Sequence, residues 1–175
     1  MTSHQTESAP LDQARVNDFL QRLRAIFNAH DLDALASLMT EEVVFEHPLA
    51  GTLHGRAEVR AFYAGFWNAF PDLAVEPADG PFFHPHSSRI TVDWLGTGTH
   101  TRPLDPPGLP ATGSHIQGHV WEMFEFRDGQ ISRIVQAFDT AGFMRQLGVL
   151  PAQGSRAERW MVVLQRLRMK LSRRR

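Results

Sequence analysis

The order of the predicted elements indicates an α+β fold, with helices first and antiparallel strands after them. Three observations carry this prediction. Apolar residues recur at helical spacing before residue 71, namely Val16, Phe19, Leu20, Leu23, Ile26 and Phe27 in the first stretch. Apolar and polar residues alternate after residue 88, as in half-buried strands. Asp128-Gly129 then lies between two such strands, where a tight hairpin turn is expected.

The N-terminal half should contain three helices and one strand. The spacing predicts a helix over 11–30, and Asp31 can cap a second, short helix over 32–39. A β-branched and aromatic run over 43–47 predicts a strand that stops at Pro48. A third helix is expected over 56–70, ending before Pro71.

The C-terminal half should be mostly sheet. Strands are predicted over 72–76, 89–100, 114–126 and 130–139, while the segment 80–88 contains turn-forming clusters around Phe82 and Phe83. The stretch 101–113 holds four prolines and two glycines, which indicates a loop or flap. A short closing helix over 140–147 ends at Gly148.

The amino-acid composition limits the class of protein and the chemistry available to it. Hydrophobic residues make up 42% and charged residues 21% of the 175 residues, as in globular domains. The absence of cysteine excludes disulfides, thiolate metal sites and a cysteine nucleophile. No apolar run reaches the roughly 20 residues of a membrane span, and no secretory signal is recognisable, so a cytoplasmic location is expected.

The charges are unevenly placed. Residues 156–175 hold eight basic side chains and one acidic one, whereas the whole chain has a net charge of −1, so the first 155 residues carry −8. Such an acidic body is a poor nucleic-acid binder. We therefore expect a disordered tail over 1–10, a domain over 11–151 and a basic, helical tail over 152–175. That tail could pack on the domain or a partner subunit, or attach to an anionic membrane surface.

Three stretches resemble the SnoaL-like polyketide cyclases of the nuclear transport factor 2-like superfamily, over about 16–151. The first is Phe45-Glu46-His47-Pro48 followed by Gly51-Thr52-Leu53-His54-Gly55. The second is Gly98-Thr99-His100, the proline-rich flap and Pro110-Ala111-Thr112-Gly113. The third is Arg127-Asp128-Gly129-Gln130-Ile131, then Phe138-Asp139 and Gln146-Leu147-Gly148.

The resemblance implies a cone-shaped α+β barrel, with a curved sheet and helices enclosing an apolar pocket. It also implies that Asp139 is the general acid/base of the cyclases. In the related ketosteroid isomerases the general base stands where His47 stands here, and a carboxylic acid that binds the enolate stands where Glu122 stands. The chain departs from the cyclase pattern at Val135, where a tryptophan is usual, and at Asp93, where an arginine is common.

Strand alternation assigns faces to these candidates. If Asp139 faces the pocket, then Ala137 and Val135 do too, while Phe138 and Ile134 face away. The apolar surroundings would raise the pKa of Asp139; alternatively, Asp139 only caps the closing helix.

On the preceding strand Gly118, Val120, Glu122, Phe124 and Phe126 share the expected inner face. Glu122 is then a buried carboxyl group, either functional or paired with Arg133. Trp121 and Met123 would lie on the outer face, which would suit a homodimer interface.

His47 can exchange a proton near neutral pH, or it is simply a surface residue or a hydrogen-bond donor. His100 begins the flap and is a candidate for ligand contact. Aromatic residues including Phe27, Trp67, Trp94 and Phe124 are expected as core or pocket wall, together with Val120 and Val135. His84 and His86 form only an isolated pair, so no metal and no cofactor are predicted.

Three functions fit these residues. The first is a cofactor-independent enzyme that performs aldol cyclisation, isomerisation or dehydration on a small hydrophobic polyketide- or terpenoid-like substrate, with Asp139 helped by His47 or Glu122. The second is a non-catalytic small-molecule-binding or assembly module. The third is an epoxide or ester hydrolase in which Asp93 and Asp139 flank one water molecule.

Overall fold

A computed structural model describes residues 12–85, 87–105 and 108–172; the predicted tail over 1–10 lies outside these residues. Five helices and six strands follow each other in the described chain. The helices are α1 Gln13–Asn28, α2 Leu32–Ser37, α3 Gly55–Ala69, α4 Thr140–Gln146 and α5 Arg156–Ser172. The strands are β1 Met39–His47, β2 Gly51–His54, β3 Ala74–Phe83, β4 Arg89–Thr99, β5 His115–Arg127 and β6 Gln130–Phe138.

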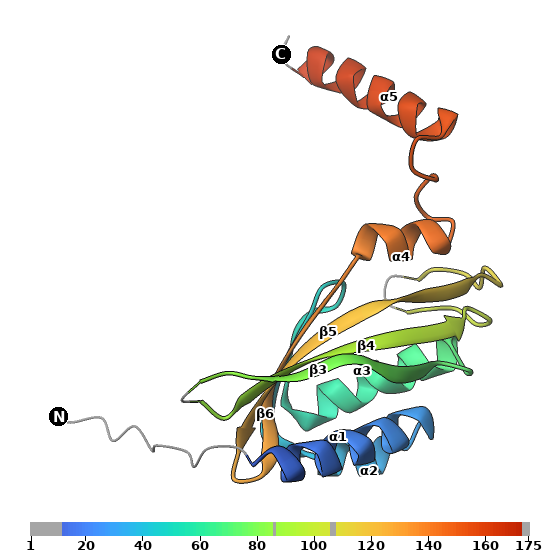
Figure 1. Cartoon of the computed structure of the whole chain (residues 1–175). Helices are drawn as coiled ribbons and strands as arrows, with labels where there is room; N and C mark the ends of the chain where they lie inside the picture. Colours follow the sequence, from blue (N-terminus) through green and yellow to red (C-terminus); the bar gives the residue numbers. More distant parts are fainter. Residues whose placement is uncertain (1–11, 86, 106–107, 173–175) are drawn as a thin grey trace.

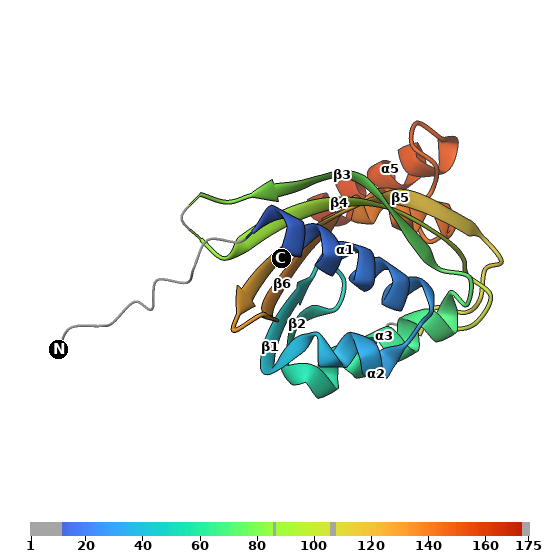
Figure 2. The ribbon, with the colours of Figure 1, turned by 60° about the horizontal axis from the view of Figure 1, so that its bottom comes forward.

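The six strands form one curved sheet in the order β2-β1-β6-β5-β4-β3. Figure 2 shows the sheet arching over α1, α2 and α3, which fill its concave side. All strand pairs are antiparallel except β1 and β6, which run parallel. The sheet is not closed, because β2 and β3 are its free edges. The predicted α+β class is confirmed, and the parallel pair is a feature that the purely antiparallel prediction missed.

Local sequence signals explain most of the element boundaries. The side chain of Asp31 accepts a hydrogen bond from the Ala34 amide at 2.9 Å and so caps α2, as predicted. At the β5–β6 turn, Asp128 and Gly129 have φ angles of 52° and 80°, and Arg127 pairs with Gln130. Positive φ at both central residues is the geometry of a type I′ hairpin, for which Asp-Gly is a favoured pair.

Strand β3 differs most from the prediction. It runs unbroken from Ala74 to Phe83 where a short strand and a separate turn-rich segment were expected. Pro77 and Pro81 lie within this strand, although proline cannot donate to a sheet ladder. An edge strand tolerates proline, and β3 is an edge strand whose pairing with β4 is irregular around these positions.

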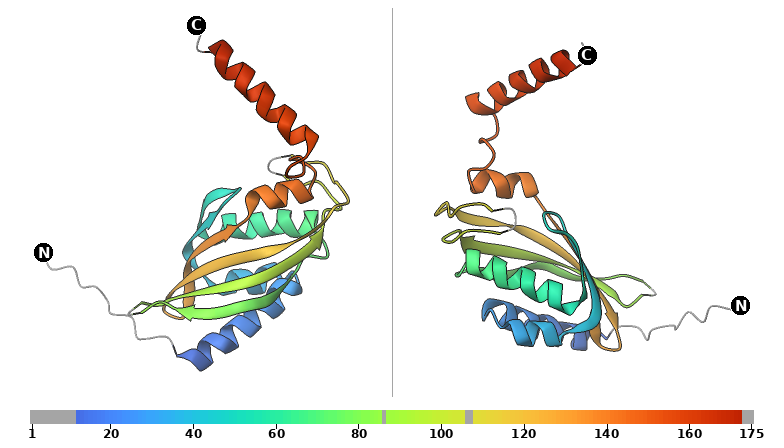
Figure 3. Two further views of the ribbon diagram at one scale, coloured as in Figure 1. Left: turned by 45° about the horizontal axis from the view of Figure 1, so that its top comes forward. Right: turned by 180° about the vertical axis from the view of Figure 1, so that it is seen from behind.

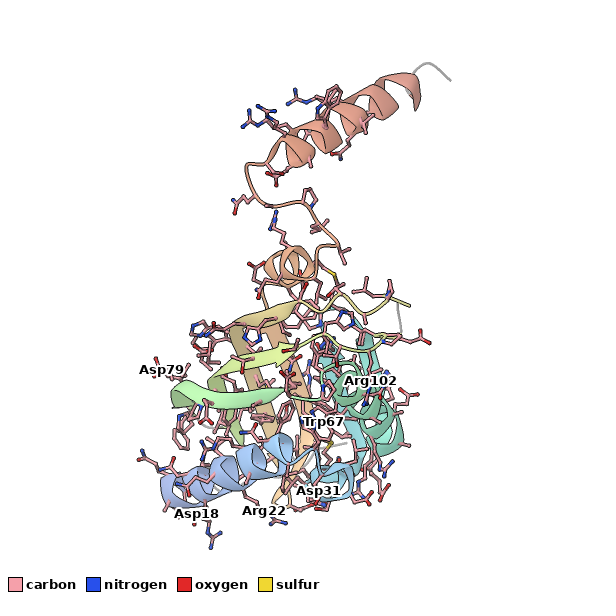
Figure 4. All side chains as sticks on the ribbon, turned by 90° about the vertical axis from the view of Figure 1, so that its right-hand side faces the viewer. Asp18, Arg22, Asp31, Trp67, Asp79 and Arg102 are labelled. Carbon is pink, nitrogen blue, oxygen red and sulfur yellow. The ribbon has the colours of Figure 1, made fainter. Side chains whose placement is uncertain are left out.

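The core lies between the concave sheet face and the helices. Val59, Tyr63 and Trp67 are buried at four-residue spacing along α3, and α1 contributes Val16, Leu20 and Leu23. Figure 4 shows Trp67 inside the body, whereas Asp18 and Arg22 project from the outer side of α1. Helix α5 stands away from the sheet and from the other helices in Figures 1 and 3.

Candidate functional site

A cavity of about 620 Å³ lies between the concave face of the sheet and the helices. Four of the predicted wall residues line it, namely Phe27, Trp94, Val120 and Phe124. The three ionisable candidates His47, Glu122 and Asp139 line it as well. Aromatic and aliphatic side chains form most of the remaining wall, so the cavity is a mainly apolar space with few polar groups.

Glu122 is the buried carboxyl group of this cavity. Strand alternation on β5 points it inward together with Val120 and Phe124, as predicted, and 9% of it is exposed. Its neighbour across the β5–β6 ladder is Gln136, whose Nε2 donates a hydrogen bond to Oε1 at 2.8 Å. The expected pairing with Arg133 is wrong, because Arg133 pairs with Glu46 of β1.

Burial raises the pKa of Glu122 from its ordinary 4.5 to about 7, because the charged form loses its hydration. The hydrogen bond from Gln136 opposes this rise of the pKa. Trp94 opposes it as well, although its Nε1 is not within normal hydrogen-bond geometry of any partner. A carboxyl group with a pKa near neutrality can both accept and return a proton at physiological pH.

His47 ends β1, where Pro48 cannot extend the sheet ladder. Its Nδ1 accepts hydrogen bonds from the amides of Leu49 and Ala50 at 3.2 and 3.1 Å, which ties the β1–β2 turn to the ring. Burial lowers the pKa of His47 from 6.5 to about 4. The imidazole is therefore neutral at pH 7, and because Nδ1 accepts, the proton is on Nε2. His47 is thus a hydrogen-bond donor through Nε2 and a poor base.

Tyr63 is a polar wall residue that sequence reasoning did not assign to the site. It lies on the buried face of α3 and lines the cavity. Burial and the nearby charge of Glu122 raise the pKa of Tyr63 well above 10, so the phenol keeps its proton. Its position four residues from both Val59 and Trp67 was the available signal, because that spacing puts it on the inward face of the helix.

Asp139 lies at the edge of the cavity and is exposed. Its Oδ1 accepts a hydrogen bond from the Gly142 amide at 2.8 Å, so it is the N-cap of α4. A Cβ atom at Gly142 would lie 2.3 Å from Asp139 Oδ2, so a larger residue there would displace the capping carboxylate. The geometry matches the second interpretation of this residue, that of a helix cap.

The face assignment on β6 is the reverse of the prediction. Ile134, Gln136 and Phe138 oppose the inward residues of β5 and line the cavity. Of the two strand residues predicted to face inward, Ala137 also contributes to the wall, whereas Val135 lies outside it. The prediction started the alternation at Asp139, but that residue follows the strand and has cap geometry, with φ −69° and ψ 88°. The orientation of the Asp139 side chain therefore does not predict which residues of β6 face the cavity. Val135 therefore does not line this cavity, and its contact with a ligand stays a prediction.

Two further predicted contacts do not line the cavity. Trp67 is buried in the core, where its ring stacks on His30 with centroids 4.8 Å apart. His100 is fully buried against Phe70, and its Nδ1 accepts a hydrogen bond from the Thr112 amide at 3.3 Å. Both side chains hold the fold together behind the cavity wall, His100 by tying the end of β4 to the loop that returns to β5.

The hydrolytic arrangement is also not formed. Asp93 does not line the cavity that Asp139 borders; it is buried and its Oδ2 pairs with His119 Nδ1 at 2.8 Å. Its ladder neighbour on β5 is Trp121, which is exposed on the outer face of the sheet. The two carboxyl groups therefore do not flank a common water in this cavity.

Within residues 12–85, 87–105 and 108–172, no three His, Asp or Glu side chains are grouped closely enough to hold a metal ion. No helix in that part of the chain is long and apolar enough to cross a bilayer.

Comparisons with known proteins agree with this architecture. TsrD from Streptomyces laurentii superposes with a TM-score of 0.68 at 23% identity, over 80% of this chain and 99% of its own. A SnoaL-like polyketide cyclase candidate from Jannaschia sp. CCS1 gives 0.69 at 21% identity, over 83% and 99%. TerC, co-crystallised with polyporic acid, gives 0.62 at 21% identity, over 77% and 98%. At these identities the likeness shows a shared fold.

No curated protein matches the chain by sequence. The family model described as "SnoaL-like domain" matches residues 20–134, which is well over half of the chain and includes β1 to β5, Glu122 and most of the helical layer. The chain belongs to the SnoaL-like domain family.

Proposed function

We propose that this protein is a cofactor-independent acid/base enzyme that moves a proton at a carbon next to a carbonyl group in a small hydrophobic substrate. The observation that carries the proposal is the position of Glu122, a carboxyl group with a pKa of about 7 in an apolar cavity. General acids and bases work best when their pKa lies near the working pH.

The other polar groups of the cavity complement this role. When Glu122 takes a proton from carbon, negative charge moves to the carbonyl oxygen. The neutral His47 can donate to that oxygen through Nε2, and the protonated Tyr63 through its hydroxyl. Aldol cyclisation, isomerisation and dehydration of carbonyl compounds can all start with this proton transfer, so the proposal covers all three.

The cavity favours a flat, apolar substrate of polyketide-like or terpenoid-like chemistry. Its volume of about 620 Å³ suits a molecule of a few fused rings, and Phe27, Trp94 and Phe124 offer aromatic surface. The co-crystallisation of TerC with polyporic acid supports a small organic ligand for this fold.

Hydrogen–deuterium exchange into β-tetralone tests the proposal without knowledge of the natural substrate. This bicyclic ketone has acidic protons next to its carbonyl, and proton NMR in D₂O follows their loss. The wild type should accelerate exchange over buffer, and Glu122→Gln should remove about a hundredfold or more of that acceleration. Glutamine keeps an acceptor oxygen for Gln136, so the local packing is preserved.

Asp139→Asn is the matched control. Asparagine caps helices as well as aspartate does, so this variant keeps α4 and should keep the exchange activity. Loss of exchange in Asp139→Asn with retention in Glu122→Gln would assign proton transfer to Asp139, as the family resemblance implies, and would refute the role of Glu122.

A non-catalytic binding protein is the second candidate, and one observation favours it. The carboxylate of Asp139 is engaged as a helix cap, not directed at the centre of the cavity. Such a protein would bind β-tetralone, detected by quenching of tryptophan fluorescence, without accelerating exchange at any pH from 5 to 9.

A homodimer stays a prediction for this chain. On the outer face of the sheet Phe82 and Trp121 stack with centroids 6.0 Å apart, and both are more than 40% exposed. Exposed aromatic pairs of this kind mark interaction surfaces. Sedimentation velocity of the wild type and of Trp121→Ser checks it, since the substitution should shift the equilibrium toward monomer.

A further inference from the structure

The first turn of helix α5, Arg156–Ser172, is joined to α4 and to the turn that precedes the helix. Glu158 accepts a hydrogen bond from the Gly154 amide and pairs with Arg145 of α4 at 3.5 Å. Arg159 donates to the Gly154 carbonyl oxygen at 3.3 Å. Beyond that first turn the helix leads away from the domain (Figures 1 and 4). The expectation that it packs on its own domain therefore finds no support.

The helix has an apolar stripe that lies open to solvent. Trp160, Val163 and Leu164 occupy one side at helical spacing and are 67%, 43% and 62% exposed. In the sequence the same spacing continues to Leu167 and Leu171. A surface helix ordinarily buries such a stripe, so its exposure indicates a binding face whose partner is not part of this chain's own fold.

The charge of the segment limits what that partner can be. Eight basic residues and one acidic residue lie between 156 and 175. Two copies of α5 side by side would bring like charges together, which opposes pairing. An anionic surface instead attracts the arginines while the apolar stripe is buried. Basic residues around a face containing tryptophan and leucine are typical of helices that lie in a membrane interface.

We propose that α5 attaches this protein to an anionic phospholipid surface, with Trp160, Val163 and Leu164 inserted between the headgroups and the arginines at the lipid phosphates. The segment that precedes α5 would then tether the folded domain to the membrane. Residues 1–155 carry a net charge of −8, so the negative lipid headgroups that attract α5 would repel the rest of the protein.

Co-sedimentation of the full-length protein with vesicles tests this proposal. Vesicles of equimolar phosphatidylglycerol and phosphatidylcholine should bind it at least tenfold more tightly than vesicles of phosphatidylcholine alone. Raising NaCl from 50 to 500 mM should release most of the protein, because salt screens the attraction. Arg166→Gln should weaken partitioning roughly fivefold, the effect of one basic residue near such a surface.

Two substitutions on opposite sides of α5 distinguish binding through the apolar stripe from non-specific hydrophobic adsorption of the helix. Leu164→Gln, on the stripe, should weaken partitioning about tenfold, the lower end of what burial of a leucine contributes. Val162→Gln, 38% exposed on the other side, should change it less than twofold. The domain's melting temperature should be the same in both variants.

Three results would overturn the proposal. One is an absence of vesicle binding, and another is equal binding to both vesicle types. The third is self-association of the wild type, abolished by Leu164→Gln and accompanied by no vesicle binding, which would show that the stripe docks on the acidic body of a second copy.

Discussion

Replacing Glu122 by glutamine should make the protein more stable, and increasingly so as the pH rises. Glutamine has nearly the same shape, still accepts from Gln136 Nε2 and carries no charge to desolvate. In the wild type the folded state holds the Glu122 proton up to about pH 7, whereas the unfolded chain releases it near its ordinary pKa of 4.5. Stability from this group is thus fully present below pH 4.5 and is lost as the pH rises toward 7 and beyond.

The size of the effect follows from the two pKa values. One unit corresponds to about 1.4 kcal/mol, so desolvating the carboxylate costs about 3 kcal/mol once Glu122 is fully ionised. Between pH 5 and pH 8 the advantage of Glu122→Gln over the wild type should therefore grow by about 2.5 kcal/mol. For a chain of this size that is a relative gain of about 5–10 °C in melting temperature.

The pH dependence of the wild type's stability does not reveal Glu122 by itself, because His47 changes that stability in the opposite direction. Its pKa is lowered to about 4 by burial, so the folded state excludes a proton that the unfolded chain binds below pH 6.5. His47 therefore lowers stability as the pH falls from 6.5 to 4, the range in which Glu122 raises it. The two contributions nearly cancel in the wild type, and only the difference between the proteins isolates Glu122.

Urea unfolding followed by circular dichroism at pH 5, 6, 7 and 8 measures this difference. The expected difference rises most steeply between pH 5 and 7 and levels off toward pH 8. A difference that stays constant within 0.5 kcal/mol across the four pH values, a margin set by roughly the usual uncertainty of such data, would refute the reasoning. Glu122 would then ionise in the fold as it does in water, and the proposed proton transfer would lose its physical basis.

Three further outcomes are expected. The Glu122→Gln variant should lose about 3 kcal/mol of stability as the pH falls from 6.5 to 4, and adding His47→Phe should remove that slope in the same urea assay. Alanine usually stabilises a helix relative to glycine, but Gly142→Ala should not stabilise the wild type, because the added Cβ meets the capping carboxylate of Asp139. In the Asp139→Ala background the same substitution should be stabilising, and the double-mutant cycle should give a coupling energy of about 1 kcal/mol. Tyr63→Phe should slow β-tetralone exchange about tenfold while the melting temperature stays within 2 °C, a margin of about 1 kcal/mol at most, and unchanged exchange would exclude the hydroxyl from the reaction.

The fold could be predicted from sequence wherever a local rule dominates. The apolar spacing of α1 and α3, the Asp31 cap and the Asp128-Gly129 hairpin each act within a few residues, and each appears in the structure. The parallel pairing of β1 with β6 joins residues about 90 positions apart, and no local pattern encodes such a contact. The unbroken β3 was missed for a related reason: the turn-forming residues of 80–88 indicated a separate segment. An edge strand tolerates such residues, and edge position is a property of the whole sheet.

The site was predictable in part for the same physical reason. Alternation along β5 identified Glu122 as an inward carboxyl group, because both neighbours on that face are apolar and the strand is regular. On β6 the alternation was counted from Asp139, which belongs to a helix cap, and Gln136 was therefore missed. Counting from Ile134, an aliphatic residue inside the strand, would have placed Gln136 on the inward face; its position opposite Glu122 depends also on the register shift between Glu125 and Phe126.

The cavity reverses the order in which its two central groups take up protons. In water a histidine binds its proton more tightly than a glutamate, so the pair at pH 5.5 is ionic. Here burial gives Glu122 a pKa of about 7 and His47 one of about 4, so between those values the acid is protonated and the imidazole is neutral. Above pH 7 Glu122 alone changes charge, while His47 remains a donor. Exchange into β-tetralone should therefore rise with pH through a single ionisation near 7 and then level off; a bell-shaped profile would require a second titrating group in the reaction.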